Sequence, residues 1–325
     1  MKILVLNRHD VESLLGIRTA IALVDDAMRA LSRGETRQLV RRILPLPGSD
    51  GGLGDMPGSL GTTRPFGLKC VAAFPSRKPG QASHRGAVLI FDENSGEPVA
   101  VIEAGTLTAI RTAAATASAT QHLARSDART LGLFGTGEQA KWHVPALLAV
   151  REFESIAVWA RDRNRAASFA RTMQDAYGVH CIAAASGADA AAADVICTVT
   201  SANDPILRGD WVRPGAHINL VGSSSAIPCE ADVDCVARSR YFVDWEVSAR
   251  AQASEFLRAL EACAVNDNHL IGEIGAVANG SVVGRRNDSE ITLYKSLGVI
   301  VQDLICGWHV YQGAKVEKRG SWVEF

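Results

Sequence analysis

The alternation of apolar and polar positions along the first third of the chain predicts a small α+β unit. Apolar residues recur at helical spacing over 17–33, and Gly34 supplies a plausible helix end. The glycine- and proline-rich stretch 48–64 is expected to be loop or turn. Extended apolar runs predict strands, the last two joined by a hairpin turn, at 39–45, 67–74, 87–92 and 98–103.

The character of the chain changes after residue 104. Alanine and threonine dominate 104–123, where small side chains allow a helix to pack closely against its neighbours. The alanine-rich stretch 183–193 and the tail 299–312 are also expected to be helical. From residue 130 onward, amphipathic segments alternate with short strands expected at 131–134, 156–159, 195–199 and 217–221. This alternation predicts right-handed crossovers and a parallel sheet.

Composition narrows the class of protein. A length of 325 residues suggests about two domains, and the 47% apolar content excludes general disorder. The net charge of −1 argues against a nucleic-acid partner bound through bulk electrostatics. No apolar run approaches the roughly 18 residues of a membrane span, and the N-terminal apolar stretch is short for a signal peptide. We therefore expect a cytoplasmic protein without a membrane partner.

The seven cysteines and eight histidines do not predict a metal centre. The cysteines form no CxxC pair, and the histidines form no HExxH motif. The simplest interpretation of the cysteines is a set of small buried side chains in a reducing compartment.

The strongest chemical signal is a Gly-x-Gly-x-x-Ala pattern directly after the strand expected at 131–134. In this pattern Gly135 permits a tight turn, Gly137 lets the backbone approach a pyrophosphate, and Ala140 permits close helix–strand packing. The first turn of the following helix offers unpaired N–H groups to phosphates. The expected dinucleotide contacts are Gly135, Thr136, Gly137, Glu138, Gln139 and Ala140. The alternative is an ordinary glycine-rich turn.

The end of the strand at 156–159 is expected to contact the adenosine ribose. NAD sites commonly place an acidic residue there, and NADP sites an arginine. Ala160 stands at the acidic position and Arg161 follows it, which favours NADP. Asp162 could still hold the ribose hydroxyls of NAD, and Arg161 could simply be a solvated loop residue.

Three cations interrupt otherwise apolar runs: Arg41, Lys69 and Arg111. A buried cation is costly unless it is paired, and three cations converging on one pocket would form a carboxylate receptor. Alternatively, each side chain extends to solvent or pairs with a structural acid such as Glu103.

These segments together resemble the ornithine cyclodeaminase and mu-crystallin family. The resemblance covers nearly the whole chain and rests on 40–45, 56–57, 68–71, 83–91, 107–114, 135–140 and 289–298. It implies a homodimer of two-domain subunits. Residues 1–122 together with 300–325 would bind the substrate and form the dimer, and residues 123–299 would form a Rossmann-type, doubly wound parallel sheet that binds the cofactor.

The same resemblance implies roles for the cations. Arg41, Lys69 and Arg111 would bind the carboxylate of an amino or imino acid, and Lys69 could instead protonate the nitrogen. Arg42 replaces Arg41 if the register is displaced by one residue. Lys295 would contact the cofactor or the substrate, or form a salt bridge between domains.

The residues after the strand at 217–221 depart from the cyclodeaminase pattern. Ser223 and Ser224 follow that strand, at the edge where open α/β sheets bind ligands, and Ser223 is a cofactor candidate. Ser224 stands where cyclodeaminases of the family carry an aspartate, whereas the ketimine reductases resemble this chain in having a serine.

The resemblance therefore implies an NAD(P)H-dependent reductase of the C=N bond of a small imino acid. Its substrate would be of the ketimine, pyrroline-carboxylate or iminosuccinate type, and the reverse reaction would be amino-acid dehydrogenation. Lys69 and Ser224 are the catalytic candidates. Arg42 and Arg85 could serve a second carboxylate, and His84 could support the site or lie in a surface loop. An NAD-dependent cyclodeaminase-type lyase and a non-catalytic binding protein remain alternatives.

Overall fold

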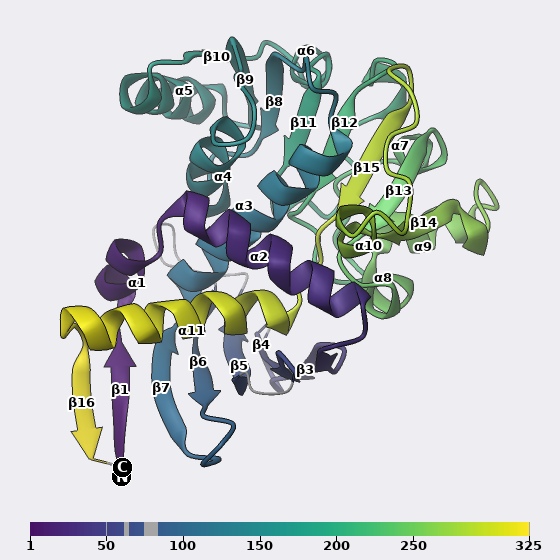
Figure 1. Cartoon of the computed structure of the whole chain (residues 1–325). Coiled ribbons are helices and arrows are strands. Elements are labelled where there is room, and N and C mark those ends of the chain that lie inside the picture. Colours follow the sequence, from purple (N-terminus) through teal and green to yellow (C-terminus); the bar gives the residue numbers. More distant parts are fainter. Residues whose placement is uncertain (50, 62–64, 75–83, 325) are drawn as a thin grey trace. The chain divides into compact units, whose positions relative to one another are not determined.

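The computed structural model describes residues 1–49, 51–61, 65–74 and 84–324, and the chain divides into two compact units (Figure 1). The first unit joins the two ends of the chain, Met1–Arg111 and Val299–Phe325, and the second is Thr112–Gly298. The division after Arg111 falls inside helix α3 (Ala104–Leu123), whereas the sequence placed the boundary at the end of this helix.

Among the described residues, the first unit is built on an eight-stranded mixed sheet. Its strands β1 and β7 are parallel, and the other neighbours are antiparallel. The order is β16 (Ser321–Glu324), β1 (Lys2–Leu6), β7 (Pro98–Glu103), β6 (His84–Phe91), β5 (Phe66–Ala73), β4 (Gly52–Ser59) and β2 (Arg37–Gln38), with β3 (Arg42–Pro45) also paired to β4. Helix α11 (Ile300–Glu317) packs on β4, β5 and β6, α2 (Ile17–Ser32) packs on α11, and α1 (Arg8–Leu14) contacts α11 and β7.

The helices expected from periodicity in this unit are confirmed. Helix α2 buries Ile21, Val24 and Met28 along one face, as the spacing predicts. Helix α3 spans the whole alanine- and threonine-rich stretch, and the tail helix α11 continues five residues beyond the expected end, to Glu317.

The stretch 48–64 was expected to be loop, and this expectation is wrong because it contains strand β4. This strand pairs with β5 along all of its eight residues and with β3 and β2 on its other side. Its glycines also admit close neighbours, since a Cβ at Gly58 would overlap the side chain of Ile300 on α11. Pairing on both sides therefore outweighs the low strand propensity of glycine and proline. Residues 50 and 62–64 lie outside the described part of the chain.

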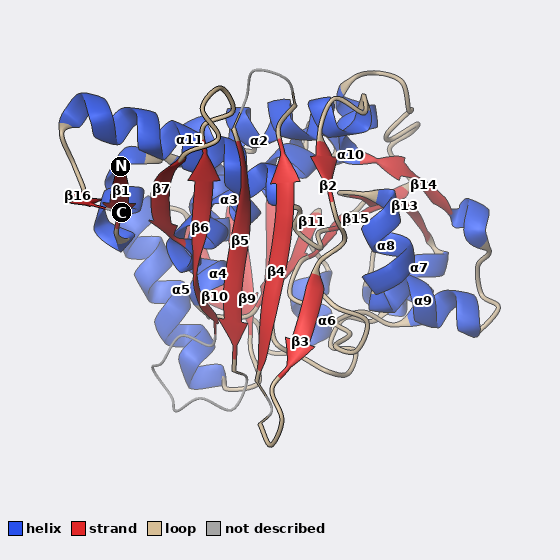
Figure 2. Cartoon of the chain, turned by 90° about the horizontal axis from the view of Figure 1, so that it is seen from below, coloured by secondary structure: helices blue, strands red, loops and turns tan. Residues whose placement is uncertain are grey.

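The face of this sheet directed away from α11 carries several apolar side chains, together with the Arg42–Asp55 ion pair. Side chains alternate along β5, so Leu68 and its cross-strand partner Leu89 point away from the face that buries Lys69. Leu53 on β4 is 40% exposed, and the rings of Phe66 and Phe91 stack with centroids 5.1 Å apart. In Figure 2 the strands β4, β5 and β6 lie in front of α11, and none of the described helices of the first unit covers them from this side.

The second unit is built on an eight-stranded sheet in which all neighbours are parallel, as the Rossmann-type prediction requires. Chain order reverses beside β8, with β9 and β10 on one side and β11 and β12 on the other. In open sheets of this kind, ligands bind at the carboxyl edge where the order reverses. The strand order is β10 (His180–Ala183), β9 (Ser155–Trp159), β8 (Thr130–Phe134), β11 (Val195–Thr198), β12 (His217–Leu220), β15 (Ile291–Lys295), β13 (Ser239–Val243) and β14 (Leu270–Glu273).

The helices of the second unit connect these strands. They are α4 (Glu138–Leu148), α5 (Arg163–Tyr177), α6 (Gly187–Ala191), α7 (Val233–Ala237), α8 (Glu246–Gln252), α9 (Ser254–Glu261) and α10 (Ile274–Ala278). The alanine-rich stretch 183–193 is helical only in its middle, where Ser186 caps α6. Nowhere in the described chain is a helix both long and apolar enough for a membrane crossing.

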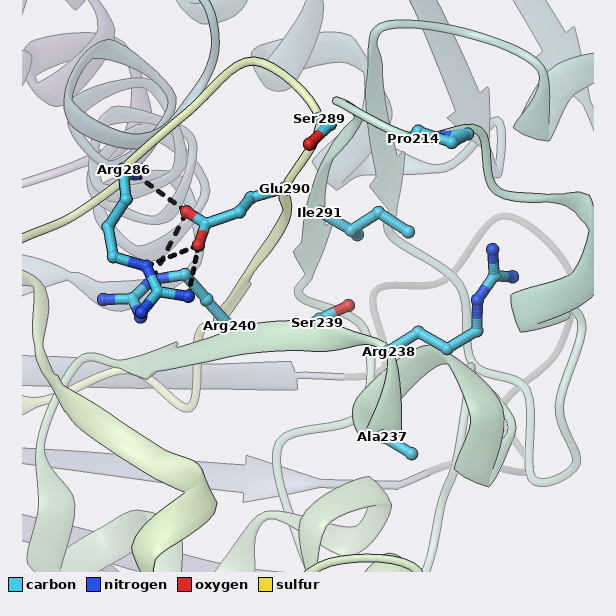
Figure 3. A pocket seen from close by; sticks show the side chains of 9 residues that line it. All are labelled: Pro214, Ala237, Arg238, Ser239, Arg240, Arg286, Ser289, Glu290 and Ile291. Carbon is cyan, nitrogen blue, oxygen red and sulfur yellow. Dashed lines mark hydrogen bonds and ion pairs between the residues drawn. The ribbon is translucent and has the colours of Figure 1, made fainter.

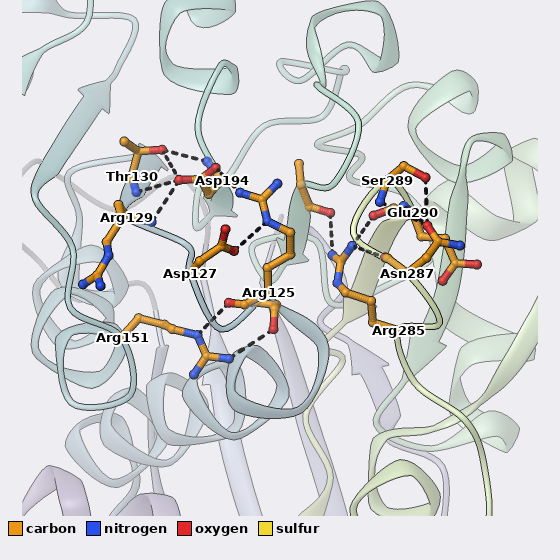
Figure 4. A network of polar contacts seen from close by, with 12 residues as sticks. Arg125, Asp127, Arg129, Thr130, Arg151, Asp194, Arg285, Asn287, Ser289 and Glu290 are labelled. Carbon is orange, nitrogen blue, oxygen red and sulfur yellow. Dashed lines mark hydrogen bonds and ion pairs between the residues drawn. The ribbon is translucent and has the colours of Figure 1, made fainter.

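Two arginines hold the last turn of α3 in the second unit (Figure 4). Arg285 donates to the carbonyl oxygen of Leu123 at 2.8 Å. Arg151 donates to the carbonyl oxygens of Thr120, Gln121, Ala124 and Arg125. The final carbonyl groups of a helix have no partner within the helix, so these guanidinium groups complete its hydrogen bonding and anchor its end.

Candidate functional site

A buried group of charged side chains in the first unit brings together β5, α3 and α11. Lys69 Nζ donates to Asp303 Oδ1 at 2.9 Å and to Thr108 Oγ1 at 2.6 Å. Arg111 Nε donates to the same Asp303 oxygen at 3.1 Å. The side chains of Lys69, Arg111 and Asp303 are 5%, 4% and 0% exposed. One carboxylate is therefore the shared counter-charge of two buried cations.

The position of each member follows from its element. Lys69 lies on the face of β5 that α11 covers, between the half-buried Leu68 and Cys70 that face the other way. Thr108 and Arg111 are three residues apart on α3 and so lie on one side of the helix. Arg111 Nη1 also donates to Gln302 Oε1 at 2.8 Å, which fixes its guanidinium group from a second direction.

Arg41 faces this group, and its neighbour Arg42 does not. Arg41 Nε lies 3.5 Å from the sulfur of Met56, the residue that is paired with Lys69 across β4 and β5. Arg42 instead forms an ion pair of 2.9 Å with Asp55 on the opposite face. The structure thus brings together Arg41, Lys69 and Arg111, in the register preferred from the sequence.

The electrostatic balance of this group is positive. Burial lowers the pKa of Lys69 to about 7, and the charges of Arg111 and Arg41 act in the same direction against the opposing charge of Asp303. Burial alone would raise the pKa of Asp303, but the charges of Arg111 and Lys69 and their hydrogen bonds hold it below its usual value. Three cations around one carboxylate leave room for the negative charge of a ligand.

Sequence reasoning missed Asp303 as the acid that pairs with these cations. Glu103, the acid considered for that role, accepts hydrogen bonds from the backbone N–H groups of Gly105 and Thr106 at the start of α3. The signal for Asp303 was present, because it is an acidic residue within the apolar run of the tail helix. A buried carboxylate is costly unless it is paired, so an acid in this position predicts a buried cation as its partner.

Arg85, considered for a second carboxylate, lies on the face of the sheet opposite to Lys69. Its cross-strand partner on β5 is Ala72, three residues from Lys69, and Arg85 is exposed. Arg42 also points to that face, so neither arginine lies on the face of the sheet that buries Lys69 within this chain. Ser83 and the side chain of His84 lie outside the described part of the structure.

The glycine motif forms a turn between β8 and α4 in the second unit. Gly135 has φ +119°, and a Cβ there would lie 3.0 Å from the carbonyl oxygen of Val199. Gly137 is the N-cap of α4, it makes no side-chain cap, and a Cβ there would meet no atom within 4 Å. Thr136, Glu138, Gln139 and the fully buried Ala140 complete the turn and the first helical residues. The open space beside uncapped N–H groups fits a phosphate.

The residues expected to contact a ribose lie after β9. Asp162 is the N-cap of α5 and accepts hydrogen bonds from the backbone N–H groups of Asn164 and Arg165 at 2.9 and 3.2 Å. Arg161 beside it is exposed. Strand β9 is next to β8, and Gly135 N donates to Trp159 O at 2.9 Å, so this loop adjoins the glycine turn.

Ser223 and Lys295, predicted to contact a cofactor, face one another inside the second unit. Lys295 Nζ forms an ion pair with Glu255 at 2.7 Å, and both side chains are fully buried. The Ser223 hydroxyl accepts a hydrogen bond from Lys295 and donates one to Glu255. Burial alone would raise the pKa of Glu255, but the charge of Lys295 holds it below its usual value. These contacts hold the two side chains in place at the carboxyl edge of the sheet, and their contact with a cofactor stays a prediction.

A second buried carboxylate, Glu230, ties the ends of β11 and β12 together. It accepts hydrogen bonds from the Thr198 hydroxyl at 2.7 Å, the Thr200 amide at 2.6 Å and the Gly222 amide at 2.7 Å. Burial nevertheless raises its pKa. Ser224 lies half-buried in the loop that this carboxylate holds. No local signal distinguishes Glu230 from exposed acids, because its burial arises from tertiary packing.

A hollow of about 490 Å³ opens at the amino-terminal ends of β13 and β15 (Figure 3). Glu290 in its wall pairs with Arg286 at 2.5 Å and with Arg240 at 3.7 Å. Arg240 also donates to the carbonyl oxygens of Val283 and Gly284. The hollow lies at the end of the parallel strands opposite to the glycine turn, the end away from the edge at which ligands bind in open sheets. We therefore do not include it in the candidate site.

Comparison with known proteins gives one consistent result. A sequence profile of the ornithine cyclodeaminase/mu-crystallin family matches residues 1–318. A Δ1-pyrroline-2-carboxylate reductase of Bacillus thuringiensis is 31% identical, covering 99% of this chain and all of the relative. The structure of the Thermococcus litoralis Δ1-pyrroline-2-carboxylate reductase in complex with NADH and L-proline superposes with a TM-score of 0.95 at 30% identity, covering 98% of this chain and 99% of that one. An archaeal alanine dehydrogenase dimer with bound NAD superposes with a TM-score of 0.94 at 28% identity, with full coverage of both chains.

The buried pair of Lys295 and Glu255 generates a test of its structural function. Glu255→Gln leaves a fully buried ammonium group without its counter-charge, so we expect a loss of about 3–5 kcal/mol in the free energy of unfolding, measured in urea. The double variant Glu255→Gln with Lys295→Met should recover part of this loss. The control Glu152→Gln removes an exposed ion pair and should change stability by under about 1 kcal/mol. Equal effects of Glu255→Gln and the control would contradict the structural interpretation.

Proposed function

This chain belongs to the ornithine cyclodeaminase/mu-crystallin family, and we propose that it reduces the C=N bond of a small cyclic imino acid of the Δ1-pyrroline-2-carboxylate type. At the level of the family, it is an NAD(P)-dependent oxidoreductase of the imine-reductase kind. The observation that carries the proposal is the buried group of Arg41, Lys69 and Arg111 around the single carboxylate of Asp303.

The second unit is suited to hold the nicotinamide dinucleotide, which supplies the hydride when bound. Gly135 permits the tight turn, and Gly137 leaves free space beside it for a ligand. The first N–H groups of α4 would hold the pyrophosphate. Solved relatives contain NADH or NAD, whereas Arg161 favours a 2′-phosphate. We infer that both cofactors are accepted and that Arg161 favours NADPH.

The first unit would hold the substrate through its carboxylate. Arg111 is fixed in advance by Asp303 and Gln302, so little side-chain entropy is lost when a ligand binds. Arg41 supplies a second guanidinium group from the same face of the sheet. Since Arg42 and Arg85 lie on the other face, a monocarboxylate fits this site better than iminosuccinate does.

Lys69 is the residue best placed to supply the proton. Its pKa of about 7 means that a substantial fraction of the ammonium form can donate a proton near neutral pH. The imine nitrogen takes this proton, the imine carbon takes the hydride, and the product is a cyclic amino acid. Asp303 accepts a hydrogen bond from Nζ, and its negative charge opposes the lowering of the pKa of Lys69, so that part of Lys69 stays protonated for this step. The hydroxyl of Ser224 is the alternative proton source.

A cyclodeaminase makes different demands on the position of Ser224. Release of ammonia requires a carboxylate that shuttles protons and stabilises a cationic iminium. A serine hydroxyl has no negative charge near neutral pH and is a weak base without a partner. A reductase requires only a protonated imine and an open path for the hydride, which a small neutral side chain permits. Ser224 therefore favours reduction over cyclodeamination.

The chain also forms a homodimer in this proposal, through the open face of the first-unit sheet. Leu53, Leu68, Leu89 and the stacked Phe66–Phe91 pair lie on that face, beside the Arg42–Asp55 ion pair and the exposed Arg85. An exposed apolar patch with charged side chains beside it is typical of a protein interface. The similar archaeal alanine dehydrogenase is a dimer.

The first prediction from this proposal separates Arg41 from its neighbour Arg42. Arg41→Ala should lower kcat/KM for the imino acid by about 10- to 150-fold, mainly through KM, because it removes a charge-assisted hydrogen bond worth roughly 1.5–3 kcal/mol. The KM for the cofactor should stay within a few-fold. The control Arg42→Ala makes the same change of charge on the opposite face and should leave both constants near the wild-type values. Equal losses in the two variants would refute the assigned register.

The second prediction tests the reaction itself. Wild-type protein should oxidise NADH or NADPH in the presence of Δ1-pyrroline-2-carboxylate, followed at 340 nm, and should release no ammonia from ornithine. Ser224→Ala should keep at least about a tenth of the rate, because one neutral hydrogen bond is worth about 0.5–1.5 kcal/mol. Proline and ammonia formed from ornithine would establish the lyase instead. Cofactor binding without turnover of any imine would establish a binding protein.

The third prediction concerns the apolar sheet face. Leu53→Asp should convert the dimer to monomer in light scattering, because it places a charge on the proposed apolar interface. The control Val316→Asp introduces the same charge on α11, at a side chain that is 83% exposed, and should remain dimeric. Dissociation in both variants or in neither would show that this face is not the interface.

A further inference from the structure

His143 lies inside the second unit and takes no part in the reaction proposed above. It belongs to α4, the helix that begins at the glycine turn, and it is fully buried. Its Nδ1 atom lies 2.7 Å from the carbonyl oxygen of Gln139, one turn earlier in the same helix. Its Nε2 atom lies 3.0 Å from the hydroxyl of Thr116 on α3. The imidazole therefore links the start of α4 to a second helix.

The surroundings fix the charge and the tautomer of this ring. Burial lowers the pKa of His143 to about 4, so the ring is neutral at physiological pH. The carbonyl oxygen of Gln139 can only accept, so the proton must be on Nδ1. In that tautomer Nε2 is an acceptor, and the Thr116 hydroxyl has two acceptors within reach of its one proton, Nε2 at 3.0 Å and the carbonyl oxygen of Thr112 at 3.1 Å. Each ring nitrogen thus has a polar partner within hydrogen-bond distance, the Gln139 carbonyl oxygen for Nδ1 and the Thr116 hydroxyl for Nε2.

The link continues from Thr116 into the sheet. Thr120, one turn further along α3, accepts a hydrogen bond at 3.0 Å from the side-chain amide of Asn219 on β12. The end of α3 is held by Arg151 and Arg285, as described above. Thr116, the partner of His143, is therefore held in a fixed position. A leucine in place of His143 would fill the same space but would bond neither to Gln139 nor to Thr116.

We propose that His143 is a positioning residue for the cofactor, which fixes the first turn of α4 through Gln139 and anchors it to α3 through Thr116. This inference rests on the proposed dinucleotide site, because the N–H groups of that turn are the ones that would hold the pyrophosphate. A residue that orients these groups contributes to phosphate affinity without touching the ligand.

The test compares variants that remove or keep the link. Thr116→Val deletes the hydroxyl in a side chain of nearly the same shape, and Thr116→Ser retains it. We expect Thr116→Val and His143→Leu to raise the dissociation constants of NADH and ADP-ribose by about 3- to 12-fold or more, the range of one lost hydrogen bond. Adenosine, which has no phosphate, should bind as before, and Thr116→Ser should restore NADH affinity. His180→Leu replaces an exposed histidine at the start of β10 and serves as the surface control.

The outcomes are distinguishable. Unchanged NADH and ADP-ribose affinity in folded Thr116→Val would overturn the positioning inference while leaving the reductase proposal intact. Equal weakening of adenosine and ADP-ribose would also overturn it, because general loosening of the fold has no preference for phosphate. Failure of the wild-type protein to bind NADH would refute the proposed function itself. If His143→Leu does not fold, ¹⁵N NMR of the wild-type ring decides, since an Nε2–H tautomer contradicts the geometry and an Nδ1–H tautomer supports it.

Discussion

The carboxylate of Asp303 is the constraint on which the chemistry of the first unit depends. Transfer of an ammonium or guanidinium group out of water costs several kcal/mol even after relaxation. For Lys69 and Arg111, hydrogen bonds to the same oxygen of Asp303 offset this desolvation free energy. The same carboxylate opposes burial and two like charges in setting the proton affinity of Lys69, and the balance lies near neutral pH. One acid thus determines both the shape of this group and its proton chemistry.

The second unit uses buried charge in the opposite way. Lys295 and Glu255 form a pair that Ser223 completes, and Glu230 accepts hydrogen bonds from the ends of two strands. These charges are matched by internal partners, so they fix loops at the carboxyl edge of the sheet. In the first unit the positive charges outnumber the negative ones. The buried Lys295 therefore has its charge matched within the fold, whereas the buried Lys69 shares one carboxylate with Arg111.

Much of the fold follows from local signals, and much of the site does not. Helices α2, α3 and α11 and the glycine turn at Gly135 were predictable, because periodicity and turn chemistry reside in neighbouring residues. Strand β4 was missed because its stability comes from partners on both sides and not from its own composition. Asp303 was missed because its partner Lys69 lies 234 residues away in the sequence. The choice between Arg41 and Arg42 needed the register of β3 on β4, which no single segment determines.

The first unit is assembled from both ends of the chain, and this has a consequence for synthesis on the ribosome. Lys69 and Arg111 are translated 234 and 192 residues before Asp303, and β1 is translated long before its partner β16. The intervening residues contain the whole parallel sheet, which emerges complete while the first unit still lacks α11. Domains generally fold as they emerge. The second unit of the nascent protein can therefore fold first. Lys69 and Arg111 then stay in water until α11 emerges and brings the carboxylate of Asp303.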